Sequence, residues 1–253
     1  MTVVLEPDIY APRRDIVSRL RRRSARVLAC DTIRPRLERG LVSFTFDDCP
    51  VSVRDTALPM LAAKGWRGTL YAALGLEGLD NHLGPHMGAA DYKAAHDAGH
   101  EIGDHTYSHL DPMRAGVGLT LADVNRNRIA LEEAGIPAPT TFAYPYGEVT
   151  PALKRALRER FALLRGIHSP QDATLDLSLA ASQRLYSAHM DDVMKALRIA
   201  AEQNYWLILF THDVRENCSE FGCTPGEFGQ VVDAVAELGL DVVPVADALE
   251  RVQ

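Results

Sequence analysis

Residues Leu41–Asp48 have the sequence LVSFTFDD, in which an apolar, β-branched and aromatic run ends in two adjacent carboxylates. Such a run predicts a buried strand, and Pro50 indicates that the strand has ended by that point. In α/β folds, the residues at the carboxyl ends of the strands carry the chemistry. Neighbouring strand residues point to opposite faces, so we expect Asp47 and Asp48 to have different roles. The alternative is a strand-to-helix turn whose carboxylates cap the helix.

Beyond this stretch, predicted strands and helices alternate to the end of the chain. We expect further strands at residues 69–74, 100–104, 141–144, 161–167, 184–187, 206–211 and 241–245. We expect helices at residues 53–64, 89–98, 119–134, 151–160, 190–202, 225–238 and 246–252, with Thr120 as the N-cap of the third. This alternation implies a parallel sheet, and at this number of strands a closed or nearly closed barrel. The predicted fold is therefore α/β, with a single distorted (β/α)7-type barrel of parallel strands.

The composition is that of a globular protein, since 47% of the 253 residues are hydrophobic and 24% are charged. The formal net charge of -7 argues against a nucleic-acid-binding protein, because such proteins normally carry a basic excess. No stretch approaches the roughly 18 apolar residues of a membrane span. The first residues lack the basic and apolar regions of a secretory signal, so we expect a cytoplasmic protein. The cysteine spacing matches no zinc or redox motif, which predicts free thiols at Cys30, Cys49, Cys218 and Cys223.

Residues 11–28 predict a basic helix with seven arginines around a thin apolar stripe, made of Ile16, Leu20, Val27 and Leu28. We expect a solvated helix that those apolar residues dock on the rest of the protein. A basic amphipathic helix can also lie on an anionic membrane or contact an acidic partner, and we expect at most a peripheral membrane contact here. The predicted organisation is an N-terminal extension over residues 1–38, packed on a barrel domain over residues 39–253.

Polar residues follow four of the predicted strands: Asp47 with Asp48, His105 with His109, the segment 144–147, and His212 with Asp213. In a barrel these strand ends converge on one face. His105 and His109 are four residues apart, so both imidazoles can reach one metal ion from a single helical turn. With Asp48 as a third ligand and open positions left over, the set is typical of a catalytic zinc-type site. Co²⁺, Ni²⁺ or Fe²⁺ also suits these ligands.

Three segments resemble the signature motifs of one family: TFDD at residues 45–48, HTYSH at residues 105–109 and LFTH at residues 209–212. Their order and spacing are similar to those of polysaccharide deacetylases with a NodB-homology domain, carbohydrate esterase family 4. The resemblance covers about residues 40–250. It implies a distorted barrel of parallel strands and makes the domain over residues 39–253 a catalytic one.

The resemblance also implies a role for each matching residue. One divalent metal ion, Zn²⁺ in the first place, would be held by Asp48, His105 and His109. Asp47 would be the catalytic base and His212 the general acid. The backbone N–H of Tyr146 would help to hold the oxyanion. This mechanism suits the residue types, because a base, an acid and an oxyanion donor together allow an amide to be hydrolysed.

The chain departs from the family in one motif. Many members have an arginine two residues before the motif proline, where it buttresses the base, whereas this chain has Ala143. That variant is similar to deacetylases of bacterial adhesive exopolysaccharides, the holdfast type among them. We expect Arg184 to supply the missing cation, with Arg165 as the other candidate, since each lies near a predicted strand. The group that tunes His212 is left open between two candidates, Asp213 and Asp191.

The expected activity is metal-dependent hydrolysis of the acetamide of N-acetylhexosamine units in a bacterial exopolysaccharide of the adhesin or biofilm type. The products would be acetate and a free amine. Because no secretory signal is evident, we expect a lipid-linked or nascent glycan as substrate, at the inner face of the membrane. Two alternatives stay open: deacylation or deformylation of a small lipid-linked sugar, and a catalytically impaired homologue that binds glycans.

Overall fold

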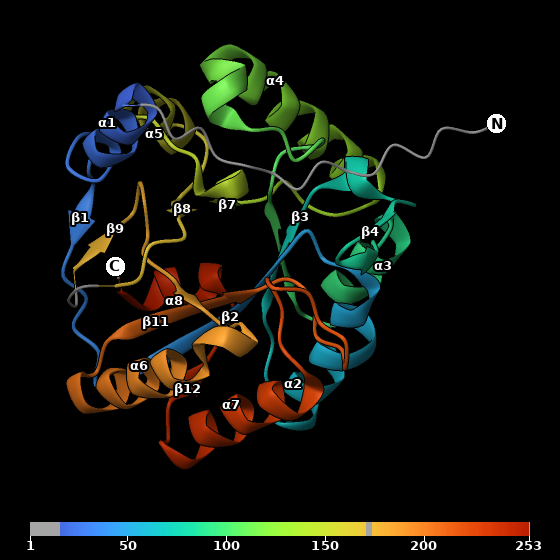
Figure 1. Ribbon diagram of the computed structural model, residues 1–253, viewed down its shortest axis with the longest axis vertical. Helices are drawn as coiled ribbons and strands as arrows, with labels where there is room; N and C mark the ends of the chain where they lie inside the picture. The colour runs from blue at the N-terminus through green and yellow to red at the C-terminus, as the bar shows by residue number, and fades with distance from the viewer. Residues whose placement is uncertain (1–15, 171–173, 253) are drawn as a thin grey trace.

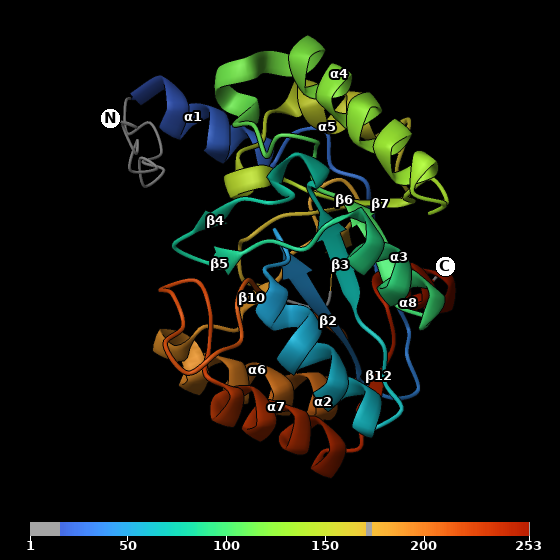
Figure 2. The same cartoon turned by 90° about the vertical axis from the view of Figure 1, so that its right-hand side faces the viewer.

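The computed structural model describes residues 16–170 and 174–252. Its centre is one eight-stranded sheet in which every strand pairing is parallel (Figures 1 and 2). The strands follow the order β10, β11, β2, β3, β6, β7 and β8, and β12 pairs with β2 as well. Their bounds are Leu41–Asp47 for β2, Thr69–Ala72 for β3, Glu101–Asp104 for β6, Thr141–Ala143 for β7, Leu163–Arg165 for β8, Gln183–Arg184 for β10, Trp206–Thr211 for β11 and Asp241–Val242 for β12.

Helices cover two sides of this sheet, with α1, α4 and α5 on one side and α2, α6 and α7 on the other (Figures 1 and 2). The helices are α1 Ile16–Ala25, α2 Leu58–Ala63, α3 Ala89–Asp97, α4 Pro112–Glu133, α5 Pro151–Arg158, α6 Met190–Gln203, α7 Pro225–Glu237 and α8 Val245–Val252. A π-helical turn, Val53–Ala57, leads into α2, and 3-10 turns occur at Leu74–Leu76, Pro145–Gly147 and Ser187–His189. In the described ranges, none of the helices has both the length and the apolar character that crossing a bilayer requires.

Two small antiparallel pairs stand outside the main sheet. Strand β1 (Thr32–Ile33) pairs with β9 (Leu175–Asp176), and β4 (Asp80–Asn81) forms a hairpin with β5 (Gly84–Pro85). The hairpin lies between residues 75 and 88, where the sequence predicted neither a strand nor a helix. In Figure 2 it lies at the left edge of the molecule, on the side toward which the arrowhead of β2 points.

The main sheet curls until its two ends meet. Strands β8 and β10 are at opposite ends of the strand order, and the segment 177–182 lies between them. The Leu164 N–H donates to the Leu177 carbonyl at 2.9 Å, and the Ala180 N–H donates to the Leu164 carbonyl at 2.7 Å. The sheet is therefore a distorted barrel of parallel strands, which confirms the predicted fold class.

The alternation of side chains along β2 explains how Asp47 reaches the barrel interior. Val42, Phe44 and Phe46 pack in the core between the sheet and helices α2 and α7. The intervening residues face the other way, as period-two alternation requires. Among them, the Thr45 hydroxyl donates to the Leu209 carbonyl at 2.8 Å inside the barrel. Asp47 follows in the same row, so its carboxylate also points inward.

The N-terminal helix is held by contacts other than the predicted apolar stripe. Leu20 is 61% exposed, Val27 72% and Leu28 51%, so the expectation that these residues dock the helix was wrong. Instead Ala25 is fully buried in a core cluster shared with α5. Residues 11–15 of the predicted helix, and the side chain of Ile16, lie outside the described residues.

Candidate active site

The chain makes a sharp turn at the carboxyl end of β2, and this turn separates the two carboxylates. Asp48 and Cys49 have φ angles of 58° and 44°, in the left-handed region that few side chains adopt. The carbonyl of Asp48 accepts a hydrogen bond from Nδ1–H of His86 at 3.0 Å, which ties the turn to the segment after the β4–β5 hairpin. Backbone strain of this kind is found where a functional geometry needs it.

Asp48 meets His105 and His109 directly above the strand ends. Its Oδ1 lies 3.3 Å from Nε2 of His109 and 3.7 Å from Nε2 of His105. One ligand atom from each of the three residues can be chosen such that all lie within 4.8 Å of one another. Nδ1–H of His105 donates to the Ala143 carbonyl at 2.8 Å, which fixes the tautomer and leaves the lone pair on Nε2.

The charge states of these three side chains suit a divalent cation. Burial raises the pKa of Asp48, but the imidazoles of His109 and His105 outweigh it and hold the pKa at about 2. Burial lowers the pKa of His105, and it lowers the pKa of His109 to about 4. At neutral pH the site thus holds one carboxylate and two neutral imidazoles, the forms in which these groups bind metal. Oδ1 of Asp48 is buried without a hydrogen-bond partner in the described part of the chain, which leaves an acceptor for the cation. The residues therefore fit a single divalent ion with open coordination positions.

The second carboxylate, Asp47, is paired with a buried arginine. Nη2 of Arg165 lies 2.6 Å from both carboxylate oxygens of Asp47. The Arg165 side chain is fully buried, and that of Asp47 is 4% exposed. The guanidinium lies 4.9 Å from the ring centre of Phe210 and 5.1 Å from that of Tyr71. The pair holds the Asp47 carboxylate in one orientation.

The cation beside Asp47 is thus Arg165, and the expectation of Arg184 in that place is corrected. Arg184 ends β10, two strands from β2, and its register partner on β11 is Phe210. The ring of Phe210 instead lies 4.9 Å from the guanidinium of Arg165, and that guanidinium contacts both carboxylate oxygens of Asp47. Arg165 is also the register neighbour of Ala143 across β7 and β8, so the charge comes from the strand beside the altered motif position.

His212 follows β11 and lies among aromatic rings. Its Nδ1–H donates to the Phe221 carbonyl at 3.2 Å, so Nε2 carries the lone pair of the neutral ring. Its ring centre is 5.7 Å from that of Phe221 and 6.0 Å from that of Tyr186. His212 is close enough to the cluster of Asp48, His105 and His109 (the metal-site cluster) to help lower the pKa of Asp48. The structure therefore brings the expected acid to the same strand ends as Asp47.

Asp213 does not contact His212. It is fully buried and accepts hydrogen bonds from Nε of Arg215 at 2.9 Å and from the backbone N–H of Ser219 at 2.8 Å. These bonds order the segment 213–223, which also supplies the carbonyl of Phe221. Nδ1 of His212 therefore bonds a backbone carbonyl rather than the side chain of Asp213, and Asp191 is exposed in the first turn of α6.

Tyr146 lies in the 3-10 turn Pro145–Gly147 with a φ of 57°. Its ring centre is 4.3 Å from that of His109, with the rings edge to face. Burial, together with the charge of Asp48, raises the pKa of the phenol to about 12. The next residue, Gly147, has a φ of 67°, and a Cβ there would lie 2.3 Å from the Ile167 side chain. The turn is thus closely packed next to the metal-site cluster.

Tyr186 and Phe221 are site residues that the sequence reasoning missed. Burial raises the pKa of the Tyr186 phenol, and the negative charge of Asp47 raises it further, which places the phenol near Asp47. Phe221 lies in the irregular segment between β11 and α7, and Tyr186 lies within the strand that the sequence predicted at residues 184–187. Neither is a charged or histidine residue directly after a predicted strand, which is the signal that indicated the other site residues.

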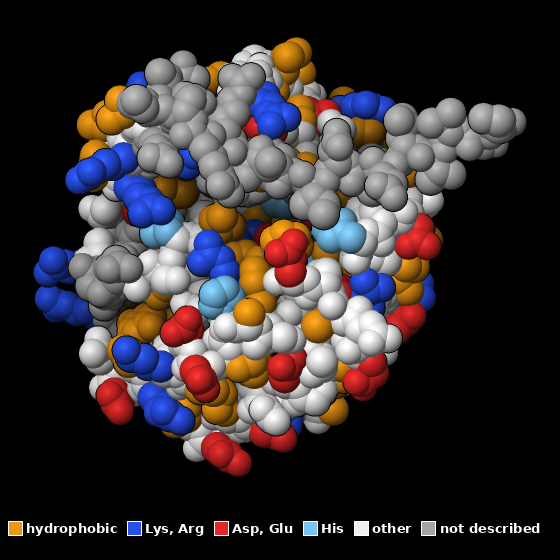
Figure 3. All heavy atoms as spheres, viewed as in Figure 1, with side chains coloured by type: hydrophobic (Ala, Val, Ile, Leu, Met, Phe, Trp, Pro, Cys, Tyr) orange, Lys and Arg blue, Asp and Glu red, His pale blue; other side chains and the backbone are white. Residues whose placement is uncertain are grey.

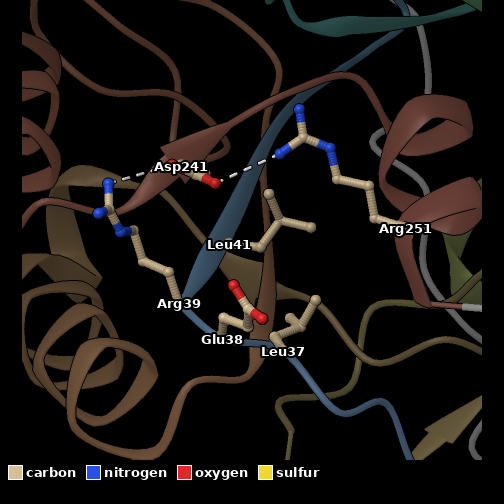
Figure 4. A pocket seen from close by; sticks show the side chains of 6 residues that line it. All are labelled: Leu37, Glu38, Arg39, Leu41, Asp241 and Arg251. Carbon is tan, nitrogen blue, oxygen red and sulfur yellow. Dashed lines mark hydrogen bonds and ion pairs between the residues drawn. The ribbon is translucent and has the colours of Figure 1, made fainter.

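The site opens on the face seen in Figure 3, where several histidine side chains surround a hollow near the middle. A separate pocket of about 380 Å³ lies at the opposite end of β2, close to Leu41 (Figure 4). Its two arginines, Arg39 and Arg251, both pair with Asp241, at 3.6 and 3.3 Å. These charges neutralise one another in part and are exposed, and the pocket contains none of the residues of the candidate site.

Comparison with known proteins gives a family and a fold. Residues 34–160 match the family model described as polysaccharide deacetylase. No match was found among curated proteins. The chitin deacetylase of Colletotrichum lindemuthianum is similar in structure, with a TM-score of 0.63, 18% identity, and coverage of 85% of this chain and 89% of that chain.

Two bacterial structures are similar as well. A family 4 carbohydrate esterase from Streptomyces lividans, solved with acetate, has a TM-score of 0.56 and 20% identity, covering 82% of this chain and 93% of that one. The peptidoglycan deacetylase PdaC from Bacillus subtilis has a TM-score of 0.53 and 16% identity, covering 85% of this chain and 92% of its own. At these identities the likeness shows a common fold.

Proposed function

The chain belongs to the polysaccharide deacetylase family, and we propose that it is a metal-dependent N-deacetylase of N-acetylhexosamine units in a bacterial exopolysaccharide. The observation that carries this proposal is the cluster of Asp48, His105 and His109 beside the ion pair of Asp47 with Arg165. The three-residue cluster can bind a cation, and Asp47 can act as a base. Hydrolysis of an unactivated amide by this route needs both.

Asp48, His105 and His109 would hold the cation, most suitably Zn²⁺. When bound, such an ion supplies Lewis acidity, which polarises an amide carbonyl and makes water more acidic. The protein's own contribution is to keep the carboxylate ionised and the imidazoles neutral, and to orient His105 through the carbonyl of Ala143. That orientation is the kind of support that metal-binding histidines usually receive.

The proton transfers would be made by Asp47 and His212. Asp47, held by Arg165, is placed to take a proton from the attacking water. His212, whose Nδ1–H bonds the Phe221 carbonyl, would as an imidazolium donate the Nε2 proton to the leaving amine. The backbone N–H of Tyr146 would donate to the oxyanion, in line with the family resemblance.

The substrate would be an adhesive or biofilm exopolysaccharide of the holdfast type, supported by the alanine at position 143. In this proposal the glycan is lipid-linked or nascent and the enzyme acts in the cytoplasm, at the inner face of the membrane. Exposed Leu20, Val27 and Leu28, beside exposed Arg26, support a peripheral contact of the N-terminal segment with that membrane.

Acetate release from N-acetylglucosamine oligomers of increasing length tests the substrate class. If the substrate is a polymer, we expect the turnover rate to rise with oligomer length and then level off. Preference for a single lipid-linked sugar, or release of formate in place of acetate, would instead identify the small-substrate deacylase. Binding of metal and oligomer without turnover on any acetylated glycan would indicate a glycan-binding homologue.

A further inference from the structure

Helix α1 lies outside the residues that match the family model, yet it contacts the segment next to the proposed oxyanion donor. Nε of Arg22 donates to Oε1 and Oε2 of Glu148, each at 3.0 Å, and Nη2 donates to Oε1 at 2.6 Å. The Glu148 side chain is 3% exposed and that of Arg22 is 28% exposed. A forked contact to a buried carboxylate fixes the relative orientation of the two groups.

Glu148 directly follows the turn that contains Tyr146 and Gly147. The N–H of Glu148 donates to the Pro145 carbonyl at 3.1 Å, and the N–H of Gly147 donates to the Tyr144 carbonyl at 2.9 Å. Tyr146 and Gly147 both have left-handed φ angles, so the direction of their N–H groups depends on the turn keeping this conformation. A contact that fixes the position of Glu148 therefore also restricts the backbone conformation of Tyr146, two residues away.

Helix α1 is itself fixed to the barrel at its C-terminal end. Nζ of the fully buried Lys154, on α5, donates to the Ala25 carbonyl at 3.0 Å and to Oδ2 of Asp176 at 2.8 Å. Ala25 is fully buried in the core cluster that includes Tyr144. Because the helix is held independently of Glu148, Arg22 can restrain Glu148 rather than follow its movements.

We propose that Arg22 is a positioning residue for the deacetylation site. Through Glu148 it holds the Tyr146–Gly147 turn in the conformation that directs the backbone N–H of Tyr146 at the reacting carbonyl. This inference rests on the proposed function, and it makes helix α1 a support for the turn that contains Tyr146. Loss of the contact would loosen the oxyanion donor without changing the metal ligands, so it should lower kcat more than it changes KM.

The test compares four full-length variants: Arg22→Ala, Arg22→Lys, Glu148→Gln and the double variant Arg22→Ala/Glu148→Gln. Arg23→Ala, which alters an exposed arginine of the same helix, is the matched control. Hydrogen–deuterium exchange of the peptide that contains residues 145–148 is measured with kcat and KM for an N-acetylglucosamine oligomer. We expect Arg22→Ala to lower kcat about tenfold with little change in KM, and to speed exchange in that peptide. Arg22→Lys should recover part of the loss, and the double variant should be no worse than the single ones.

Two results would overturn the inference. In one, Arg22→Ala and Arg23→Ala share the same kcat and the same exchange in residues 145–148. In the other, Arg22→Ala lowers the thermal midpoint while exchange in that peptide, measured well below the midpoint, stays as in the wild type. If the wild type released no acetate, the proposed function would fail, but the exchange comparison would still decide whether Arg22 restrains the turn.

Discussion

Asp47 and Asp48 are adjacent in the chain, but their partners give them different chemistry. Asp48 faces the imidazoles of His105 and His109, and burial lowers their pKa values. Neutral imidazoles beside a carboxylate form a set of ligands that suits a cation. Asp47 instead pairs with the fully buried guanidinium of Arg165, which fixes the orientation of its carboxylate. The left-handed turn at Asp48 and Cys49 is what separates the two environments.

Substitution of Arg165 is the sharpest test of the role assigned to Asp47. An arginine placed at its register neighbour Ala143 can restore the positive charge that the substitution removes. We expect Arg165→Ala to lower kcat about 100-fold, since the base loses its fixed orientation. It should also destabilise the fold by about 3–5 kcal/mol, because a buried carboxylate loses its partner. Steady-state kinetics and urea unfolding measure the two effects.

The matched variant for this prediction is the double change Ala143→Arg/Arg165→Ala. It returns an arginine to the position that many family members use, one strand away from the native one. Recovery of about tenfold in kcat over Arg165→Ala would show that the base needs a cation rather than this particular side chain. Wild-type kcat in Arg165→Ala with the metal bound would contradict the assignment.

The site residues that directly follow strands, such as Asp48, His105 and His212, could be predicted from the sequence. Each of them is marked by the end of a predicted strand next to it in the chain. Arg165 could be suggested but not chosen over Arg184, since both lie near strands. The choice depends on how the sheet curls to bring β8 across the barrel to β2, which is a property of the whole sheet. Likewise, the carbonyl that bonds His212 belongs to Phe221, nine residues farther on.

At the scale of elements, the predicted strands and helices were found, while some starting points were not. Helix α4 begins at Pro112 instead of near residue 119, and Asp111 is its N-cap in place of Thr120. The signal was present as an aspartate before a proline, the usual order at a helix start. The backbone at Gly116, with a φ of 77°, is not helical, so the part of α4 after this glycine is the helix that the sequence indicated near residue 119.

Helix α4 gives a stability prediction. The Asp111 side chain accepts from the N–H groups of Met113 and Arg114, at 2.8 and 3.3 Å. Asp111→Ala should therefore lower the free energy of unfolding by about 1 kcal/mol in urea titrations. Thr120→Ser is the control, because it keeps the hydroxyl that bonds the Gly116 carbonyl, and we expect a smaller loss from it. A smaller loss for Asp111→Ala than for the control would refute the capping role.

At the scale of the whole molecule, charge is distributed unevenly. The chain has a net charge of -7, yet residues 11–28 contain seven arginines and one acidic residue. Within this segment Leu20 and Val27 are more than half exposed. An exposed apolar and basic surface of this kind is suited to the surface of an anionic bilayer.

Vesicle co-sedimentation checks this contact. We expect binding to phosphatidylglycerol-containing vesicles that weakens as salt shortens the Debye length, and little binding to phosphatidylcholine alone. Leu20→Ser/Val27→Ser should reduce it, whereas Leu238→Ser, at an exposed leucine far along the chain, should not. Equal binding by the wild type and the Leu20→Ser/Val27→Ser variant would rule out the N-terminal segment as the contact.

The curled barrel assembles the candidate site, because it brings the carboxyl ends of β2, β6, β7, β8 and β11 together. Acetate release from an N-acetylglucosamine oligomer, with the protein as prepared, after chelation and after reloading with Zn²⁺ or Co²⁺, tests the central claim most directly. We predict release that is lost on chelation, restored on reloading, and absent in an Asp47→Asn variant that still binds the metal. Release that persists after complete removal of the metal, or in Asp47→Asn, would contradict it.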